Sequence, residues 1–465
     1  MTASGEHRLP LPAAEIRRLV EADRRHLWHP FTQTKEWAEQ PMLIVAAGEG
    51  PYLIDVEGNR YLDGVSSLWV SLHGHRREEI DRAVRDQLDR VAHSTLLGLS
   101  HVPAIELAEK LAQLAPGGLT RVFYSDSGST AVEAALKIAY QYWQQQPDRT
   151  KRYKRQIVSC HRAYHGDTLG AVSVGGIDLF HACYHPLLFP TLKVHYPCCY
   201  RCHLGLSQPR CGMACLEELE SLLERQGHTI AALIIEPLVQ AAAGMITAPR
   251  GYLQGVERLC RLHEVLLIAD EVAVGCGRTG TLFAVEQESV CPDLLTLAKG
   301  VTGGYLPLAA TLVREQIFEA FEGEYAEGRT FFHGHTYTGN PLAARAALAS
   351  LEIFEQDKTL ENLAPKIRHL TRRLEEFRTL DQVGDVRQCG FLAGIELVRD
   401  QAAKEPYPVG ERRGMRVALE ARRHGLLIRP LTDVIVIMPP LIISLPELDR
   451  MLDILHTCIR TVTES

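Results

Sequence analysis

Short apolar runs and helical stripes alternate along most of the chain. Residues 230–238, IAALIIEPL, and 265–272, VLLIADEV, are nearly continuous apolar runs, as is typical of strands that are buried on both faces in a parallel sheet. Residues 129–143 instead repeat apolar side chains at helical spacing. They predict a helix whose buried stripe consists of Val132, Ala135, Leu136, Ala139, Tyr140 and Trp143. This alternation of elements predicts an α/β fold.

The pattern changes near residue 350. From there on we expect a long charged helix, a strand over 390–398, a helix over 411–425, strands over 426–430 and 434–440, and a final amphipathic helix. This order of elements is typical of an α+β module. The C-terminal part is therefore expected to form a separate, smaller domain.

Length and composition agree with two or three globular domains. The chain has 465 residues, of which 46% are hydrophobic and 23% are charged, and a domain takes about 150 residues. The net charge of −7 is spread without a basic block, which argues against nucleic acid or anionic lipid as a partner. No run reaches the roughly 18 apolar residues of a membrane span. Residues 1–20 lack an apolar signal segment, and 12 cysteines are too few for a disulfide scaffold, so we expect a cytoplasmic protein.

Two carboxylates, Asp270 and Glu271, come at the end of one apolar run. Ligands of open α/β sheets bind at the carboxyl ends of the strands, and a carboxylate in a dry site stays charged only beside a cation or a proton donor. Lys299 is a candidate partner, because it follows the apolar run LLTLA. A desolvated lysine can become neutral and form a Schiff base. Taken alone, Lys299 is more simply a side chain that reaches solvent from a strand end.

A glycine-containing turn precedes the first predicted helix. Ser127, Gly128 and Ser129 form this turn. Glycine lets the backbone approach a ligand closely, and the free N–H groups of a helix start bind phosphate. The alternative is an ordinary capped helix, since Thr130 and Glu133 fit a capping box.

Together these three features describe a cofactor with a phosphate, an aldehyde and a ring nitrogen. Pyridoxal 5′-phosphate (PLP) has all three. The turn would take the phosphate, Lys299 the aldehyde, and Asp270 would keep the pyridine nitrogen protonated, so that the ring serves as an electron sink. Glu271 has no role in this scheme, and we expect it to form a structural hydrogen bond.

Two longer motifs resemble the class III PLP-dependent aminotransferases of fold type I. They are LIADEVAVGCGRTGTLFA and LAKGVTGGYLPLAATL, and the resemblance extends over nearly the whole chain. Within that class, several stretches resemble the 7,8-diaminononanoate synthases of biotin biosynthesis. These are HLWHPFTQ (26–33), HSTLLG (93–98), YHGDTLGAVSV (164–174), HGHTYTGNPLA (333–343) and LLIRPL (426–431).

The resemblance implies an architecture and a reaction. The large domain, with a mainly parallel sheet flanked by helices, would span residues 76–345 and bind PLP, and residues 1–75 and 346–465 would form the smaller α+β domain. The reaction implied is a ping-pong transamination of 8-amino-7-oxononanoate to 7,8-diaminononanoate. The amino donor would be S-adenosylmethionine or lysine, and the enzyme would be a homodimer with shared active sites.

Single residues receive roles by their position in the family motifs. Gly128 and Ser129 match the phosphate-binding pair, and Tyr164 matches an aromatic residue beside the cofactor that also reaches substrate. A ring stacked on the pyridine would fix its tilt. Asp270 matches the partner of the pyridine nitrogen, and Lys299 matches the catalytic lysine that binds cofactor and substrate in turn.

Further matches lie in the second half of the chain. Gly334 matches a substrate contact, and His335 and Thr336 match a phosphate-binding pair that the neighbouring subunit supplies in this family. Arg429 matches the residue that grips the substrate carboxylate, a task that suits a planar guanidinium. Without the family, Arg429 could equally be a surface arginine at a strand end.

The identity of the amino donor stays open. Family members that use S-adenosylmethionine carry two adjacent tryptophans where this chain has Leu68 and Trp69, and a tyrosine in place of Phe31. Leucine offers no aromatic face, so stacking of adenine and attraction of the sulfonium would weaken. The family favours S-adenosylmethionine, whereas these residues favour lysine.

Some other features have simpler interpretations. The cysteine pairs in residues 198–215, spaced C-x₂-C and C-x₃-C, could bind zinc. A surface insertion with free thiols fits better with a reaction that needs no metal, so we expect no metal site. His73 and His75 could perform acid–base chemistry, but histidines that are hydrogen-bonded in a loop or in the core are the favoured interpretation.

Two other functions remain as alternatives. Another class III aminotransferase would act on ornithine, 4-aminobutyrate or a diamine, although the ornithine-type members carry glutamine where this chain has Ala273. The alternative that is not an enzyme is an inactive scaffold with the same fold. The presence of both Asp270 and Lys299 argues against it.

Overall fold

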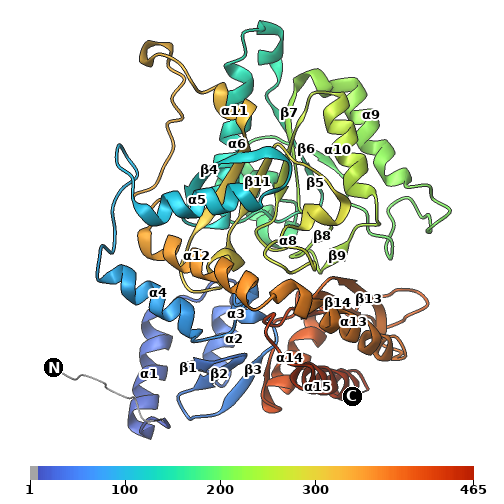
Figure 1. Cartoon of the computed structure of the whole chain (residues 1–465). Helices are drawn as coiled ribbons and strands as arrows, with labels where there is room; N and C mark the ends of the chain where they lie inside the picture. Colours follow the sequence, from blue (N-terminus) through green and yellow to red (C-terminus); the bar gives the residue numbers. More distant parts are fainter. Residues whose placement is uncertain (1–8, 465) are drawn as a thin grey trace.

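A seven-stranded sheet forms the centre of the larger lobe in the computed structural model, which describes residues 9–464 (Figure 1). The strand order is β4-β12-β11-β10-β7-β5-β6. Strand β12 is antiparallel to both of its neighbours, and the other pairs are parallel. The strands are β4 (Leu119–Ser125), β5 (Gln156–Cys160), β6 (Leu192–Val194), β7 (Ile230–Ile235), β10 (Leu266–Asp270), β11 (Leu294–Leu297) and β12 (Ala309–Arg314).

Helices cover both faces of this sheet, which is the α/β arrangement expected from the sequence. On one face, α6 (Gly128–Gln144) and α7 (Leu169–Val174) share an apolar cluster with the sheet. A second apolar cluster, on the other face, includes α5 (Val102–Leu114), α9 (Glu217–Gln226), α10 (Tyr252–Leu262) and α12 (Pro341–Gln356). Strands β7 and β10 are buried along their whole length. The prediction of two-sided burial is therefore confirmed.

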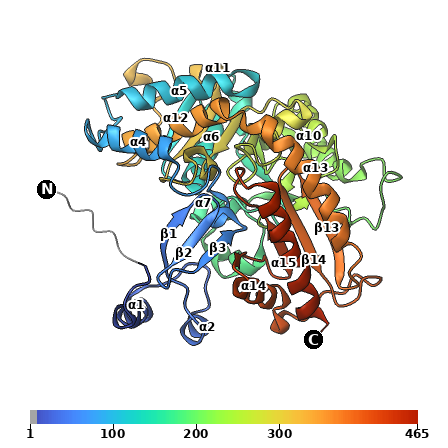
Figure 2. The ribbon, with the colours of Figure 1, turned by 60° about the horizontal axis from the view of Figure 1, so that its bottom comes forward.

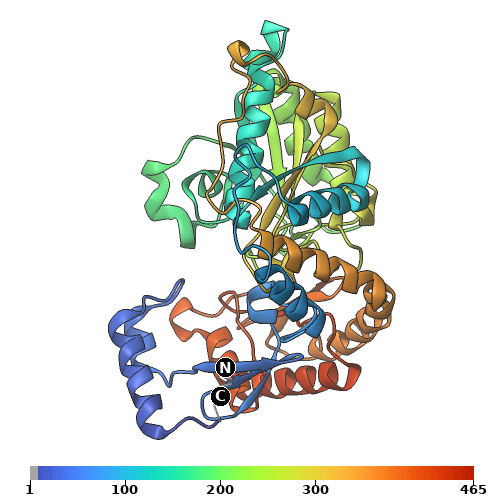
Figure 3. The ribbon, with the colours of Figure 1, turned by 60° about the vertical axis from the view of Figure 1, so that its left-hand side comes forward.

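The smaller lobe combines both ends of the chain (Figures 2 and 3). One sheet has the order β1-β2-β3-β15, and β15 pairs in parallel with β3, with Leu426 opposite Leu62. A second sheet has the order β13-β14-β16, and α13, α14 and α15 pack beside it. The elements are β1 (Val45–Glu49), β2 (Tyr52–Asp55), β3 (Arg60–Asp63), β13 (Val383–Cys389), β14 (Leu392–Leu397), β15 (Leu426–Leu427), β16 (Val434–Ile437), α13 (Thr359–Phe377), α14 (Arg413–Arg423) and α15 (Leu445–Thr463).

The remaining elements connect these parts. They are α1 (Ala13–His26), α2 (Thr34–Glu39), α3 (Ser66–Trp69), α4 (Glu78–Leu88), α8 (Asp178–His181), α11 (Glu315–Glu319), β8 (Val239–Gln240) and β9 (Ile246–Thr247), with short 3₁₀ turns between them. No helix within residues 9–464 is long and apolar enough to span a membrane. The domain boundaries at 75 and 345 stay a prediction, and residues 1–8 of the first segment lie outside the described residues.

The predicted buried stripe of α6 needs one correction. Tyr140 is 43% exposed, whereas the other members of the stripe are buried. The buried members of the predicted stripe follow the spacing i, i+3, i+4, i+7 and i+11 from Val132, and Tyr140 falls at the edge of that stripe. An exposed ring at this position is thus compatible with a well-packed helix.

The predicted capping box of α6 is also wrong. Ser127 is the N-cap, and its Oγ accepts a hydrogen bond from the Thr130 N–H at 3.4 Å, while Thr130 Oγ1 accepts one from the Ser127 N–H at 2.9 Å. The helix begins at Gly128, so Thr130 lies inside its first turn instead of capping it. Glu133 instead accepts a hydrogen bond from the Gly170 N–H at 2.9 Å.

Candidate active site

A cavity of about 430 Å³ opens where β10, β11 and the start of α6 meet. This position, at the carboxyl ends of parallel strands, is where ligands of α/β sheets bind. The cavity brings together seven of the residues that were assigned a role in binding from the sequence, and they come from distant parts of the chain. They are Trp69, Ser127, Gly128, Ser129, Tyr164, Asp270 and Lys299.

Asp270 is the last residue of β10, and its carboxylate is held from several sides. Its Oδ1 accepts hydrogen bonds from the Val272 N–H and from the Thr296 hydroxyl, both at 3.0 Å. Its Oδ2 lies 2.6 Å from Nδ1 of His165, and both side chains are buried. A buried carboxylate with this many partners has a fixed direction, as is needed to receive the N–H of a ligand.

Lys299 enters the same cavity from the turn after β11. Its Nζ lies 5.5 Å from the centre of the Trp69 ring. Burial lowers the pKa of Lys299, while the charges of Asp270 and Glu236 act in the opposite direction. A lowered pKa increases the share of neutral amine, which is the nucleophilic form.

The N-terminus of α6 borders the cavity with Gly128 and Ser129. A side chain at Gly128 would bring its Cβ to 2.6 Å from Val272, so only glycine fits there. Ser129 Oγ accepts a hydrogen bond from the Asp167 N–H at 3.2 Å. Free backbone N–H groups at the start of a 17-residue helix form a suitable site for phosphate.

Tyr164 also lines the cavity. Its hydroxyl donates to Asp167 Oδ2 at 2.7 Å, and its backbone N–H donates to Glu236 Oε2 at 3.1 Å. Its ring stacks on His181, with centroids 6.2 Å apart. Burial, together with the hydrogen bond to Asp167, raises the pKa of the Tyr164 hydroxyl. The hydroxyl therefore stays protonated, and Asp167 holds its proton.

Sequence reasoning missed two residues of this site, Glu236 and His165. Glu236 follows the buried strand β7 and accepts hydrogen bonds from the N–H groups of Tyr164 and Ala241. Burial, followed by the charge of Asp270, raises the pKa of Glu236 to about 8. Glu236 could have been found by the pattern that pointed to Asp270, because it too is a carboxylate directly after an apolar run. His165 gave no comparable signal, because its partner Asp270 lies 105 residues away.

Three of the residues predicted to contact substrate, Phe31, Leu68 and Arg429, do not line the cavity. Arg429 is exposed, and its guanidinium lies 5.9 Å from the centre of the Phe31 ring. Phe31 is 55% exposed and meets the edge of Phe180 at 5.4 Å, and Phe180 in turn meets Tyr164 at 6.2 Å. This row of rings connects Arg429 with the cavity wall. Leu68, which precedes the buried Trp69, is 46% exposed.

The residues predicted to act in a neighbouring subunit do not line the cavity of their own chain. Gly334 and Thr336 are exposed, and His335 is half-buried. His335 Nδ1 lies 2.9 Å from Asp126 Oδ2, next to the start of α6.

The interpretations given to three further residues agree with the structure. Glu271 is buried and accepts hydrogen bonds from the N–H groups of Ala284 and Val285, at 2.7 and 2.9 Å. His73 is buried and lies 3.0 Å from the Ser350 hydroxyl through Nε2, and His75 pairs with Asp63 at 3.1 Å. The predicted structural hydrogen bond of Glu271 is therefore confirmed.

Comparison with known proteins identifies the family of this chain. The sequence profile described as Aminotransferase class-III matches residues 33–459. The chain belongs to the class III aminotransferases. These enzymes use PLP, and this cavity presents the groups that PLP needs: a fixed carboxylate, a desolvated lysine and a free helix N-terminus.

Relatives of this class III aminotransferase carry a more specific name. Adenosylmethionine-8-amino-7-oxononanoate aminotransferase of Nitratidesulfovibrio vulgaris is 56% identical, covering 98% of this chain and 84% of its own. The enzyme of that name from Geobacter sulfurreducens is 54% identical, covering 97% and 100%. The crystal structure of the one from Methanocaldococcus jannaschii has a TM-score of 0.91 at 45% identity, covering 96% and 99%.

A solved structure also bears on the cofactor. The omega-transaminase of Pseudomonas jessenii, in complex with the amine form of the cofactor, PMP, is 32% identical and has a TM-score of 0.91, covering 96% of this chain and 98% of its own. The prediction of a PLP-dependent transferase fold is therefore confirmed.

Proposed function

We propose that this class III aminotransferase converts 8-amino-7-oxononanoate to 7,8-diaminononanoate in biotin biosynthesis. The observation that carries the proposal is the 56% identity, over 98% of the chain, to an enzyme named for this substrate. The geometry of the cavity supports the chemical part, because Asp270 and Lys299 border one space together with the N-terminus of α6.

PLP supplies an aldehyde and an electron-withdrawing pyridine ring when it is bound. Gly128 and Ser129 would bind its phosphate through backbone N–H groups, and Asp270 would hold the proton of the ring nitrogen. The hydrogen bonds from Val272, Thr296 and His165 keep the Asp270 carboxylate in place for that task. No reorganisation is then needed during the reaction.

Lys299 moves the protons in this proposal. Its neutral amine would take a proton from the carbon of the amino donor and return it to the cofactor, first as a base and then as an acid. Burial supports this role, since it lowers the pKa of Lys299. The Tyr164 hydroxyl, fixed by Asp167, lies on the wall that substrate would pass.

Arg429 would bind the substrate carboxylate at the rim. It is exposed and lies next to the rings of Phe31 and Phe180, so a long apolar chain could run along these rings with its carboxylate at the guanidinium. Gly334, His335 and Thr336 would complete the site from a neighbouring subunit.

A homodimer is supported by exposed apolar side chains near that loop. Leu97, Leu99 and Phe332 are between 61% and 79% exposed, and the two segments that carry them adjoin, since the rings of His93 and Tyr337 are 4.7 Å apart. A surface of this kind is typical of a subunit interface. The 12 cysteines are all free, which supports a reducing compartment such as the cytoplasm.

The amino donor is S-adenosylmethionine or lysine in this proposal. The names of the relatives favour S-adenosylmethionine. Leu68 favours lysine, because its exposed side chain offers no aromatic face for adenine.

Product formation tests the proposal. The purified PLP-loaded enzyme is given 8-amino-7-oxononanoate, with S-adenosylmethionine and lysine supplied in separate reactions, and 7,8-diaminononanoate is quantified by mass spectrometry. Formation with one donor is the expected result. No product with either donor, together with turnover of ornithine, 4-aminobutyrate or a simple diamine, would favour another class III activity. No turnover of any amine would favour an inactive scaffold.

A further inference from the structure

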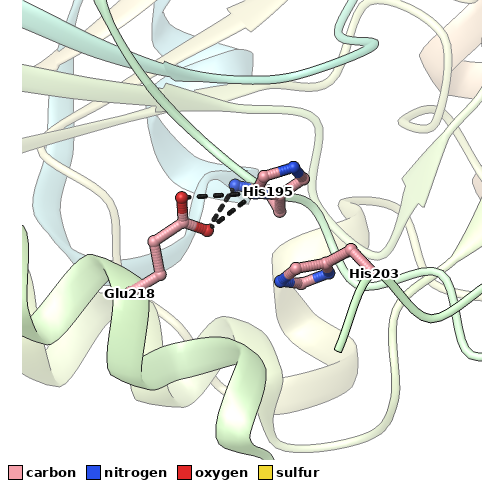
Figure 4. Close-up of side chains that lie close together, drawn as sticks. All are labelled: His195, His203 and Glu218. Atoms are coloured by element: carbon pink, nitrogen blue, oxygen red, sulfur yellow. Dashed lines mark hydrogen bonds and ion pairs between the residues drawn. The ribbon is translucent and has the colours of Figure 1, made fainter. Parts of the chain in front are cut away.

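Three possible metal ligands meet on the surface of the larger lobe, away from the cavity. His195 follows β6, His203 lies in the cysteine-rich loop 198–215, and Glu218 is in the first turn of α9. One donor atom of each lies within 4.8 Å of the others (Figure 4). None of the three borders the PLP cavity. The cluster therefore has no role in the proposed reaction.

The spacing of the donors suits a metal ion. His195 Nδ1 lies 3.0 and 3.2 Å from the two carboxylate oxygens of Glu218. Two ligand atoms at 2.0–2.2 Å from a tetrahedral zinc ion stand about 3.3 Å apart. The distance between His195 Nδ1 and the Glu218 carboxylate is thus close to the separation of two ligands on one ion. A small movement of the Glu218 side chain would make room for the ion.

The second histidine faces the first. The rings of His203 and His195 are 4.2 Å apart and nearly parallel, with an angle of 10° between their planes. The side chains of His195 and Glu218 are 43% and 36% exposed, and His203 is exposed as well. An ion could enter from solvent, and rotation of the His203 ring would turn a nitrogen toward it.

A third imidazole lies beside the pair, since the ring of His161 is 4.6 Å from that of His195. Glu218 supplies the negative charge that balances the ion.

We propose that His195, His203 and Glu218 bind one divalent transition-metal ion of the zinc type. The ion fastens the loop 198–215 to α9 and to the end of β6, and it stabilises this part of the larger lobe without entering catalysis. Two imidazoles and a carboxylate form a donor set that zinc accepts, with a fourth position left for water.

This site differs from the one that the sequence suggested and set aside. A small neighbouring cavity of about 20 Å³ is lined by the thiols of both cysteine pairs noted in the sequence and by one further thiol. These are Cys198, Cys199, Cys202, Cys211 and Cys215. Within residues 9–464, however, no three thiols approach one another as closely as the histidine–glutamate cluster does. The expectation of no metal considered only the reaction and the cysteines. It did not consider His195, which precedes the loop, or His203, which lies within it.

Zinc binding to the PLP-loaded enzyme tests this inference. After treatment with a chelator, the protein is titrated with Zn²⁺ alone in a calorimeter, and its melting temperature is measured with and without the ion. His203→Ala is compared with His228→Ala, a variant of an exposed histidine outside the cluster. A third variant, Cys199→Ser with Cys202→Ser, removes the nearest thiol pair. Substitution by Co²⁺ reports whether sulfur binds the ion, because thiolate ligands add a strong charge-transfer band.

One ion per chain is expected in the wild type and in both control variants, with a rise in melting temperature. His203→Ala should weaken binding at least about tenfold and abolish the rise, while its aminotransferase activity stays unchanged. The inference would be overturned if the wild type bound no Zn²⁺, or if His203→Ala bound it as tightly as the wild type. It would also be overturned if only the cysteine variant lost Zn²⁺ binding and the charge-transfer band of bound Co²⁺.

Discussion

His165 Nδ1 lies 2.6 Å from Asp270 Oδ2, and both side chains are buried between the sheet and the cavity. The second ring nitrogen of His165, Nε2, is buried and has no hydrogen-bond partner among the described residues. The ring is therefore held mainly by Asp270, and in return it fixes the direction of the carboxylate. His165 acts through Asp270 and is a positioning residue.

Replacing His165 tests this relationship. His165→Ala should lower kcat by about 10–150-fold, since a hydrogen bond to a charged group contributes roughly 1.5–3 kcal/mol. His165→Asn should recover part of the loss, because its amide N–H can donate from a position similar to that of Nδ1. Steady-state kinetics of the three proteins at saturating cofactor provide the measurement. If both variants lost activity to the same extent, the effect would be one of packing and not of the hydrogen bond.

Asp270→Asn removes the negative charge and keeps the shape. The variant should still bind PLP through the phosphate site, but kcat should fall by about 100–1000-fold, the usual effect of removing one fixed electrostatic group. Cofactor content from absorbance spectra, measured beside kcat, separates binding from catalysis. An unchanged kcat in a PLP-loaded variant would show that Asp270 is not the partner of the ring nitrogen.

The sequence predicted much of this site, for a physical reason. Apolar runs identified β7 and β10 as buried strands, and the rule for their carboxyl ends pointed to Asp270. The same rule applies to Glu236, which sequence reasoning overlooked. The contact between His165 and Asp270 could not be predicted, because it depends on the strand order of the folded sheet, in which β7 separates β10 from β5.

Local sequence also left smaller features undecided. The sequence pattern places the capping box of α6 three residues too late. Only Thr130 with Glu133 fits the usual pattern of a capping box, whereas the observed box pairs Ser127 with a threonine. The cluster of His195 and Glu218 likewise depends on tertiary structure, since β6 and α9 approach only after the loop between them has folded back.

Arg429→Ala tests the binding of the substrate carboxylate. The KM for 8-amino-7-oxononanoate should rise by about 30–150-fold, because a charge-assisted contact contributes roughly 2–3 kcal/mol. The half-reaction with the amino donor should change less if the donor does not use this arginine. Rapid-mixing measurements of each half-reaction provide the comparison. Equal damage to both would point to a shared contact or to a structural role.

Leu68→Trp tests the choice of donor. A tryptophan at this exposed position would offer adenine an aromatic face, and stacking contributes about 0.5–1.5 kcal/mol. The kcat/KM for S-adenosylmethionine should therefore rise about 2–12-fold, with little change for lysine. A wild type that is already efficient with S-adenosylmethionine and inert with lysine, combined with no gain in the variant, would show that Leu68 does not influence the donor.

A single-turnover half-reaction tests the central claim most directly, because it does not depend on the donor. Enzyme loaded with PMP is mixed with 8-amino-7-oxononanoate alone, and diaminononanoate is measured together with the absorbance of the cofactor. Lys299→Ala serves as the control, since it lacks the amine that moves the proton. One equivalent of product per loaded site in the wild type, and none in Lys299→Ala on the same timescale, is the predicted result. No product from the wild type, or equal product from both proteins, would contradict the account.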